Sequence, residues 1–248
     1  LGPITRFTAP GSAVLVGMDS LQNNRLAVGG HTGELAPHVD AFLAESHSFS
    51  NAWTPFARTY PSWVSILSGR YPMRHGIRFN LLPDSFLAAD NHYLGEVFQE
   101  HGHNTFHATD ETRFSIIRPL FGYDDMLHPK MGVSDFLLGS FFDFSAANVA
   151  RQSHLGHDLF PAIANNRAAV GYEPAIWTRN VLKRLNALPA DEPVFFSTHL
   201  CANHWPFSSS ARHYWAEDSG LDASIAMLDE QVGALPDYSA PPGRADTA

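Results

Sequence analysis

Three short segments with the character of buried strands constrain the fold more than any other feature of this sequence. They span residues 13–20, 104–109 and 193–200, and the first is almost wholly apolar. Short apolar runs of this kind are typical of strands that are covered on both faces. Because segments with helical periodicity separate them, the pattern predicts an α/β sandwich with a largely parallel central sheet.

Helices are expected wherever apolar residues recur every three or four positions. The segments with this spacing are residues 37–45, 59–68, 93–100, 173–188 and 222–235. Residues predicted to face the core include Val39, Phe42, Val64, Ile66, Leu67, Trp177, Val181, Ile225 and Leu228. Gly69 is expected to end the second of these helices.

Two stretches show no regular period. Residues 119–172 are rich in Phe, Gly, Pro and His and are interpreted as a long excursion over the sheet, of the kind that often shapes a substrate pocket. Residues 236–248 contain three prolines among mixed polar residues and predict a disordered tail. The sequence thus predicts one domain over residues 1–235.

Composition excludes some partners and leaves the compartment open. The net charge of −9, without a basic run, argues against nucleic acid. Cys201 is the only cysteine, which excludes an intrachain disulfide and a cysteine-rich zinc site. No apolar run reaches the roughly 18–20 residues that span a bilayer. The chain begins at Leu1 rather than Met, which leaves open an upstream signal or anchor that would direct it to the periplasm or a membrane.

A hydroxyl residue stands at the predicted start of the helix 59–68. Thr59 lies two positions before Pro61, and proline is well placed in the first turn of a helix because its missing N–H costs little there. A helix N-terminus favours negative charge, so Thr59 occupies a reasonable position for a nucleophile that attacks an anionic ester. The alternative is that Thr59 only caps an ordinary short helix.

Polar residues follow all three predicted strands, where parallel sheets gather their ligands. Asp19 ends the first strand and is a candidate metal ligand, unless it only opens the next turn. His199 and His204, at the end of the third, are candidates for binding a metal or an anion, with a structural role as the alternative. Residues 110–113, which end in Arg113, form either part of a site or a solvated turn.

The order of these motifs resembles the sulfatase branch of the alkaline phosphatase superfamily. Residues 18–21 are similar to the end of that family's opening metal-binding strand, and residues 37–45 with 49–52 are similar to its next helix and strand. Residues 59–76 align with its nucleophile motif without a gap. Residues 199–207 resemble the segment that supplies a substrate-binding histidine.

The resemblance implies roles for individual residues. Thr59 stands at the nucleophile position, and Asp19 and Thr59 are expected to hold a divalent cation such as Ca, Mg, Mn or Zn. His204 matches the family's substrate-binding histidine and is assigned to catalysis. His199 and Arg113 are expected to contact the substrate.

Three departures from the family pattern bear on the chemistry. A sulfatase has Cys or Ser at the nucleophile position, for conversion to formylglycine, and Arg four residues later, where this chain has Thr59 and Trp63. Threonine cannot give that aldehyde, and this motif looks more like that of the superfamily's phosphodiesterases and phosphotransferases. Ser20 leaves the paired aspartates of many sulfatases incomplete. No strand with a metal-binding Asp-His or Asp-Asn pair follows residues 222–235, so the C-terminal part of the family fold is expected to be truncated.

The expected function is metal-dependent hydrolysis or transfer of sulfate or phosphate esters, with Thr59 favouring phosphoesters. The substrate would be a small-molecule, lipid or glycan ester. The alternative is a catalytically inactive fragment or pseudoenzyme that keeps the fold and binds an anion, because a site with few ligands holds metal poorly.

Overall fold

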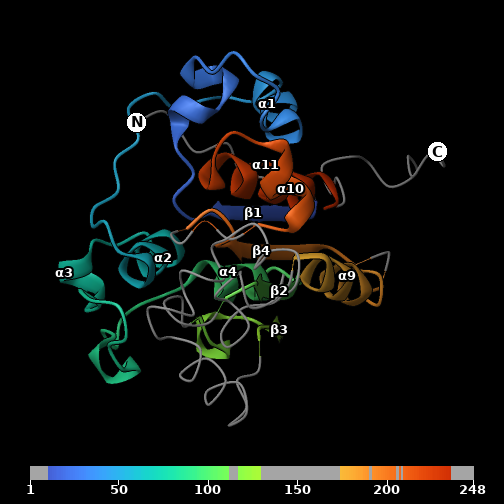
Figure 1. Ribbon diagram of the computed structural model, residues 1–248. Coiled ribbons are helices and arrows are strands. Elements are labelled where there is room, and N and C mark those ends of the chain that lie inside the picture. The colour runs from blue at the N-terminus through green and yellow to red at the C-terminus, as the bar shows by residue number, and fades with distance from the viewer. Residues whose placement is uncertain are drawn as a thin grey trace, which may run out of the picture.

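The structure, a computed structural model, describes residues 11–111, 117–129, 174–189, 192–204, 207 and 209–235 (Figure 1). Within these residues, parallel strands form one sheet in the order β1-β4-β2-β3. The strands are β1 (Ala13–Met18), β2 (Asn104–Thr109), β3 (Asp125–Leu127) and β4 (Val194–Leu200). The predicted α/β fold with a parallel sheet is confirmed, and β1, β2 and β4 lie within two residues of the predicted segments.

β3 contradicts the prediction that residues 119–172 form only an irregular excursion. Three residues are too few to show a period of two, so this strand is decided by its pairing with Phe106, His107 and Ala108 of β2. Asp124 holds the approach to β3, since its Oδ2 accepts hydrogen bonds from the N–H and the hydroxyl of Thr105 at 3.0 and 2.8 Å. Most of the predicted excursion, residues 130–172, lies outside the described residues, as does the predicted tail at 236–248.

The stretch at residues 49–52 is turn and coil, although the family resemblance predicts a strand there. It pairs with none of the described strands. Phe49 and Trp53, which supply its apolar character, are 83% and 88% exposed. Apolar side chains alone therefore do not make this segment a strand, because none of the described strands lies beside it to accept and donate backbone hydrogen bonds.

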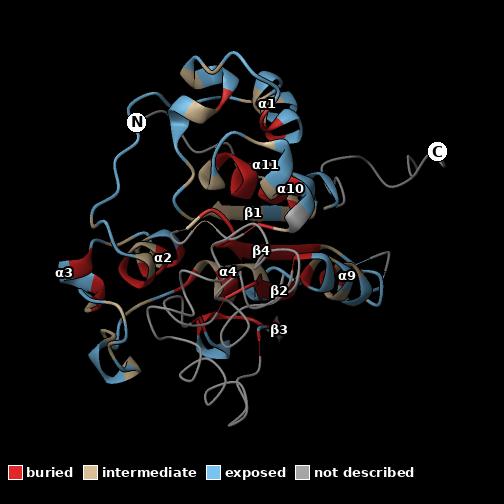
Figure 2. Cartoon of the chain, viewed as in Figure 1, coloured by how far each residue is buried: buried red, intermediate tan, exposed pale blue. Residues whose placement is uncertain are grey.

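One face of the sheet is covered by α9 (Pro174–Leu185) and α11 (Gly220–Gly233), and α10 (Ala211–Ala216) packs beside α11 (Figure 1). Alternate strand residues meet the two helices in one core, whose members include Phe106, Ala108, Phe196, Leu200, Trp177, Val181, Met227 and Leu228. β4 is buried along its whole length, as expected for a strand between two others (Figure 2). No helix in the described ranges is long and apolar enough to cross a membrane.

The opposite face is covered by α2 (Thr59–Ser68) and α4 (Leu94–Glu100), and the short α3 (Pro72–His75) follows α2. The buried stripe of α2 is Tyr60, Trp63, Val64 and Leu67, which follows the helical period. Ile66 lies outside this stripe and is 52% exposed. The prediction that Ile66 faces the core is therefore wrong. α2 ends at Ser68 as predicted, because Gly69 takes a left-handed conformation (φ 64°) that glycine adopts without strain.

α11 packs against a second partner, α1 (Pro37–Ala44), on the side away from the sheet (Figure 1). Ile225 of α11 and Val39 of α1 are buried in a small core that they share. The inward face of α1 is Val39 and Leu43, and Phe42 projects outward with 70% exposure, contrary to the prediction. Arg25 also joins the N-terminal segment to α11, through an ion pair with Asp222 at 2.8 Å.

Asp229 of α11 caps α1 across this interface. Its Oδ1 accepts a hydrogen bond from the N–H of Val39 at 2.8 Å and its Oδ2 one from the N–H of His38 at 3.1 Å. These N–H groups belong to the first turn of α1 and have no partner within the helix. Burial raises the pKa of Asp229 above its ordinary value, while the two N–H groups favour the charged form. The cap therefore fixes the start of α1 from a residue 190 positions away.

Asp229→Ala is expected to lower the free energy of unfolding by about 3 kcal/mol, because two N–H donors lose a charged acceptor. Chemical denaturation measures this difference. Glu230→Ala is the matched control at the next position, since Glu230 is half-exposed where it pairs with Arg212 and His213 and should contribute less than about 1 kcal/mol. Equal losses in the two variants would show that Asp229 does not anchor α1.

Candidate active site

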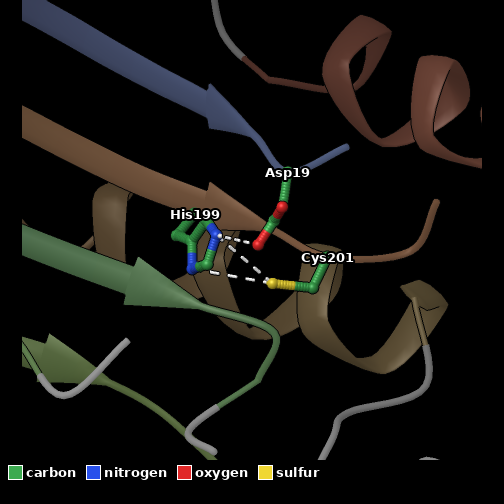
Figure 3. Close-up of side chains that lie close together, drawn as sticks. All are labelled: Asp19, His199 and Cys201. Atoms are coloured by element: carbon green, nitrogen blue, oxygen red, sulfur yellow. Dashed lines mark hydrogen bonds and ion pairs between the residues drawn. The ribbon is translucent and has the colours of Figure 1, made fainter. Parts of the chain in front are cut away.

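The carboxyl ends of β1 and β4 bring three side chains together at one edge of the sheet (Figure 3). The strand pairing continues past β1, because the N–H of Asp19 donates to the C=O of Leu200 at 2.9 Å. The side chains of Asp19, His199 and Cys201 point toward one another, and one potential ligand atom of each lies within 4.8 Å of the others. The chain then turns away sharply, since Ser20 takes a left-handed conformation with φ 60°.

Thr59 reaches this group from the start of α2. Its Oγ1 donates a hydrogen bond to Oδ2 of Asp19 at 3.1 Å. Arg58, not Thr59, occupies the cap position of α2, and it makes no side-chain capping bond. The alternative that Thr59 only caps its own helix is therefore wrong. The structure brings the predicted nucleophile and the predicted metal ligand into direct contact.

The first turn of α2 offers fewer free amides than a helix N-terminus ordinarily does. The N–H of Tyr60 donates to Oδ1 of Asn80 at 3.0 Å, and Pro61 has no N–H. The N–H of Ser62 already bonds within the helix. Among the described residues, the expected set of anion-binding amides therefore reduces to that of Thr59 itself, and a negative charge at this point must be stabilised mainly by other groups.

Asp19 is held as a carboxylate. Burial opposes its ionisation, but the hydrogen bond from His199, the charges of His199 and His204 and the hydrogen bond from Ser20 outweigh burial and lower the pKa of Asp19 to about 2. Nε2 of His199 lies 3.4 Å from Oδ2 of Asp19. At neutral pH the site therefore presents a negative charge to Thr59, which favours a bound cation and makes Asp19 a weak base.

Trp63 fills the space beneath the site, at the position where the family resemblance leads one to expect an arginine. Its ring meets His199 edge-on, with the ring centroids 5.2 Å apart and the planes at 67°. A Cβ added at Gly17 of β1 would lie only 2.4 Å from the Trp63 ring. The missing side chain of Gly17 thus makes room for Trp63, which supports His199 by packing and brings no positive charge.

A buried polar chain lies next to Trp63. Nδ1 of His107 is 2.7 Å from the hydroxyl of Ser197, which donates to Oη of Tyr123 at 2.7 Å. Burial, with the charges of His199 and His128, lowers the pKa of His107 to about 3, so this histidine is neutral at pH 7. The hydroxyl of Ser197 donates its hydrogen to Tyr123 and can only accept from His107. Nδ1 of His107 is therefore the protonated ring nitrogen that donates to Ser197. These hydrogen bonds hold the side chains of His107, Ser197 and Tyr123 in place beside Trp63, and the neutral His107 adds no charge to the site.

Only the first two residues of the predicted polar cluster at 110–113 belong to the described part of the chain. Asp110 is fully buried, and its two carboxylate oxygens accept the N–H of Cys201 at 2.9 and 3.1 Å. Its own N–H donates to the C=O of His199 at 3.2 Å. The alternative of a solvated turn is therefore wrong for Asp110, which ties the end of β2 to the end of β4. Arg113 lies outside the described residues.

Cys201 was not predicted to be a site residue. From the sequence, this cysteine served only to exclude a disulfide and a cysteine-rich zinc site. Its Sγ lies 3.3 Å from Nε2 of His199. The available signal was its spacing, because residues two apart in an extended segment share a face. His204, which sequence reasoning did select, is half-buried in the following turn, and its N–H donates to the C=O of Cys201 at 3.0 Å. Its predicted role toward substrate stays a prediction.

Comparison with known proteins adds a family match. A family model described as Sulfatase matches residues 12–235. A curated relative, the ulvan-active sulfatase of Formosa agariphila, is 30% identical over 87 residues, which is 35% of this chain and 16% of the relative.

Solved structures share the fold at low sequence identity. The phosphonate monoester hydrolase of Agrobacterium radiobacter has a TM-score of 0.59 and 16% identity, and the match covers 90% of this chain and 58% of that one. The C-terminal periplasmic domain of EcEptC from Escherichia coli, in complex with Zn, has a TM-score of 0.53 and 13% identity, over 91% of this chain and 58% of that one. The chain thus spans little more than half the length of either structure.

Gly17→Ala is expected to lower the free energy of unfolding by about 1–3 kcal/mol, because the added methyl group overlaps the Trp63 ring. Chemical denaturation measures the loss, and Gly11→Ala is the matched control, since a Cβ there meets no atom within 4 Å. Combining Gly17→Ala with Trp63→Leu should recover part of the stability. An unchanged stability in Gly17→Ala would mean that Trp63 does not pack against β1 in solution.

Proposed function

The chain belongs to the sulfatase family, and we propose that it hydrolyses or transfers phosphate or sulfate esters through a covalent ester of Thr59. The observation that carries this proposal is the 3.1 Å hydrogen bond from Thr59 to the ionised carboxylate of Asp19. Thr59 is the first residue of α2 and not its cap, so its hydroxyl is free of the capping role. Here the hydroxyl is turned away from the helix and toward the strand end where ligands gather in parallel sheets.

The groups around Thr59 fit a divalent cation. Asp19 offers a carboxylate oxygen and Thr59 a hydroxyl oxygen, which are ligands that such cations accept. A cation bound there would lower the pKa of the hydroxyl and stabilise negative charge on the transferring group. Asp19 cannot activate the Thr59 hydroxyl in place of a cation by acting as a general base. With a pKa of about 2, it is far too weak to take the proton of an alcohol.

Each residue of the site has a separate role in the proposed reaction. The hydroxyl of Thr59 gives its proton to solvent water, and its oxygen attacks the phosphorus or sulfur atom. The bond to the ester's alcohol oxygen breaks, so that this oxygen leaves with the electron pair and takes a proton from water. Water or a second alcohol then attacks the Thr59 ester and restores the hydroxyl. Asp19 orients the hydroxyl through its hydrogen bond, and His199, only 2% exposed, holds Asp19 in place. His204 is assigned to the charged oxygens of the substrate.

Phosphoesters are the favoured substrates. Threonine cannot be converted to the formylglycine of sulfatases, and Trp63 leaves the site without the arginine expected beside that residue. A relative whose name gives a sulfatase and a structural neighbour whose name gives a phosphonate monoester hydrolase both support the general ester class. The acceptor or alcohol part of the substrate would be a small molecule, a lipid or a glycan. Arg113 keeps its predicted role as a substrate contact, whereas the buried His199 is assigned to hold Asp19 instead.

A second candidate function is anion binding without turnover. It is favoured by the composition of the group at the strand ends, where the described residues supply one carboxylate, Asp19, to a potential metal site. A site with one carboxylate holds a hard cation such as Mg²⁺ or Ca²⁺ weakly, since these cations require several oxygen ligands. The two functions differ in whether Thr59 ever becomes esterified.

Thr59→Ala is expected to reduce kcat/KM for an aryl phosphodiester by more than about 1,000-fold, because the attacking oxygen is removed. The release of nitrophenol from bis(p-nitrophenyl) phosphate measures the rate. Thr59→Ser should keep part of the activity, and Ser62→Ala, which removes a hydroxyl bonded only to nearby groups of the same segment, should keep all of it. Full activity in Thr59→Ala would reject the nucleophile, and no activity in any variant would favour the anion-binding function.

Chelation of divalent cations is expected to abolish turnover, and their return should restore it, because the Thr59 hydroxyl is unreactive alone. The same assay, run with an aryl phosphodiester and an aryl sulfate, gives the ratio of the two rates. We expect that ratio to favour the phosphodiester. A rate indifferent to chelator would remove the cation from the mechanism, and a preference for sulfate would overturn the choice of phosphoester.

A further inference from the structure

We propose that Cys201 is a metal ligand, and that with Asp19 and His199 it makes this site selective for zinc or a chemically similar transition-metal ion over Ca²⁺ and Mg²⁺. The biological role of this selectivity rests on the proposed ester chemistry at Thr59, but the ligand assignment itself does not. The three residues come from the ends of β1 and β4, and their side chains converge in Figure 3.

The separations of the side chains are short enough for the three groups to share one metal ion. Sγ of Cys201 lies 3.3 Å from Nε2 and 3.6 Å from Nδ1 of His199, and Nε2 lies 3.4 Å from Oδ2 of Asp19. Because the sulfur lies beside both ring nitrogens, binding requires the Cys201 side chain to turn toward an ion on the Nε2 side of the ring. Zinc bonds of about 2.3 Å to sulfur and about 2.0–2.2 Å to nitrogen and oxygen place tetrahedral ligands roughly 3.3–3.6 Å apart. Thr59 Oγ1 lies 3.1 Å from the same Oδ2, so the hydroxyl is in contact with one ligand of this group.

The chemistry of the three donors excludes the hard cations. Ca²⁺ takes about 6–8 oxygen ligands, and Mg²⁺ about six in octahedral geometry, and neither binds sulfur well. This group has one carboxylate, one imidazole and one thiol. Imidazole and thiolate are ligands that zinc and similar ions prefer. His199 and Cys201 are 2% and 4% exposed, so the nitrogen and sulfur are shielded from water that would otherwise supply oxygen ligands.

The backbone and the ring packing orient the ligands before any ion binds. The carboxylate of Asp110 fixes the backbone of Cys201 by accepting its N–H with both oxygens. Trp63 packs edge-on against the ring of His199. Groups that orient metal ligands in this way strengthen binding. The competing role for Cys201 is that of a small buried thiol in contact with His199.

Cobalt(II) is the probe that separates these two roles, because thiolate bound to Co²⁺ gives a charge-transfer absorption in the near ultraviolet. Cys201 is the only cysteine of the chain, so a thiolate band can come from no other residue. The full chain, freed of metal with a chelator, is titrated with Co²⁺. We expect the band to saturate at one equivalent and Zn²⁺ to displace it, with Mg²⁺ and Ca²⁺ in excess having no effect.

Variants locate the ligands. Cys201→Ser should lose the band and weaken Zn²⁺ binding by more than about 100-fold, the upper range for loss of a mere supporting group. His199→Ala should weaken Zn²⁺ binding similarly. His92→Ala, which removes an exposed histidine paired with Glu96 on the surface, is the matched control and should change neither quantity. Circular dichroism checks the fold of each variant, and the titration of the unaltered chain stands even where a variant does not fold.

The outcomes distinguish this inference from the proposed function. Binding of Co²⁺ without a thiolate band, or unchanged Zn²⁺ affinity in folded Cys201→Ser, would reject Cys201 as a ligand. Ester hydrolysis supported by Mg²⁺ or Ca²⁺ at full rate in Cys201→Ser would reject the selectivity and leave the function of Thr59 standing. A thiolate band with no turnover of any ester would keep the zinc site and reject the proposed function.

Discussion

The contact between Thr59 and Asp19 depends on how closely α2 docks against β1. The first residue of the helix can reach the end of the strand only because Trp63, one turn further on, lies directly over the strand. Gly17 makes that approach possible, since any side chain there would overlap the Trp63 ring. A packing constraint between one large and one absent side chain therefore sets the distance between two polar groups, and the chemistry of the site follows from it.

The carboxylates of Asp19 and Asp110, at the ends of the two strands on either side of β4, differ in their surroundings. Asp110 is fully buried, and both of its oxygens accept the N–H of Cys201, so it fixes the backbone at the end of β4. Asp19 keeps part of its surface open, and its oxygens face Thr59 and His199. Its low pKa shows that the site favours the charged form in spite of burial. A carboxylate kept charged in this way is suited to hold a cation rather than to accept a proton.

The N-terminal segment is attached to the far end of the chain by polar contacts as well as by packing. Asp229 caps α1, Asp222 pairs with Arg25, and Ile225 lies between them in the shared core. All three residues belong to α11, whose other face covers the sheet. One helix thus joins the sheet to α1, and the periodicity of its apolar residues gives no sign of the second contact, because capping by a distant carboxylate leaves no local pattern.

The sequence by itself determined the strands β1, β2 and β4 and the helices α1, α2, α4, α9 and α11, because apolar period and glycine stops are local properties. It also placed Asp19 and His199 at strand ends and Thr59 at a helix start, where the structure has them. The tertiary structure alone decided that β3 is a strand, that residues 49–52 are not, that Ile66 and Phe42 face outward, and that Cys201 lies beside His199. Each of these depends on which backbone or side chain lies opposite, and a single chain position carries no information about its partner across the fold. The same reason explains why Asp110 looked solvated in the sequence and is buried in the structure.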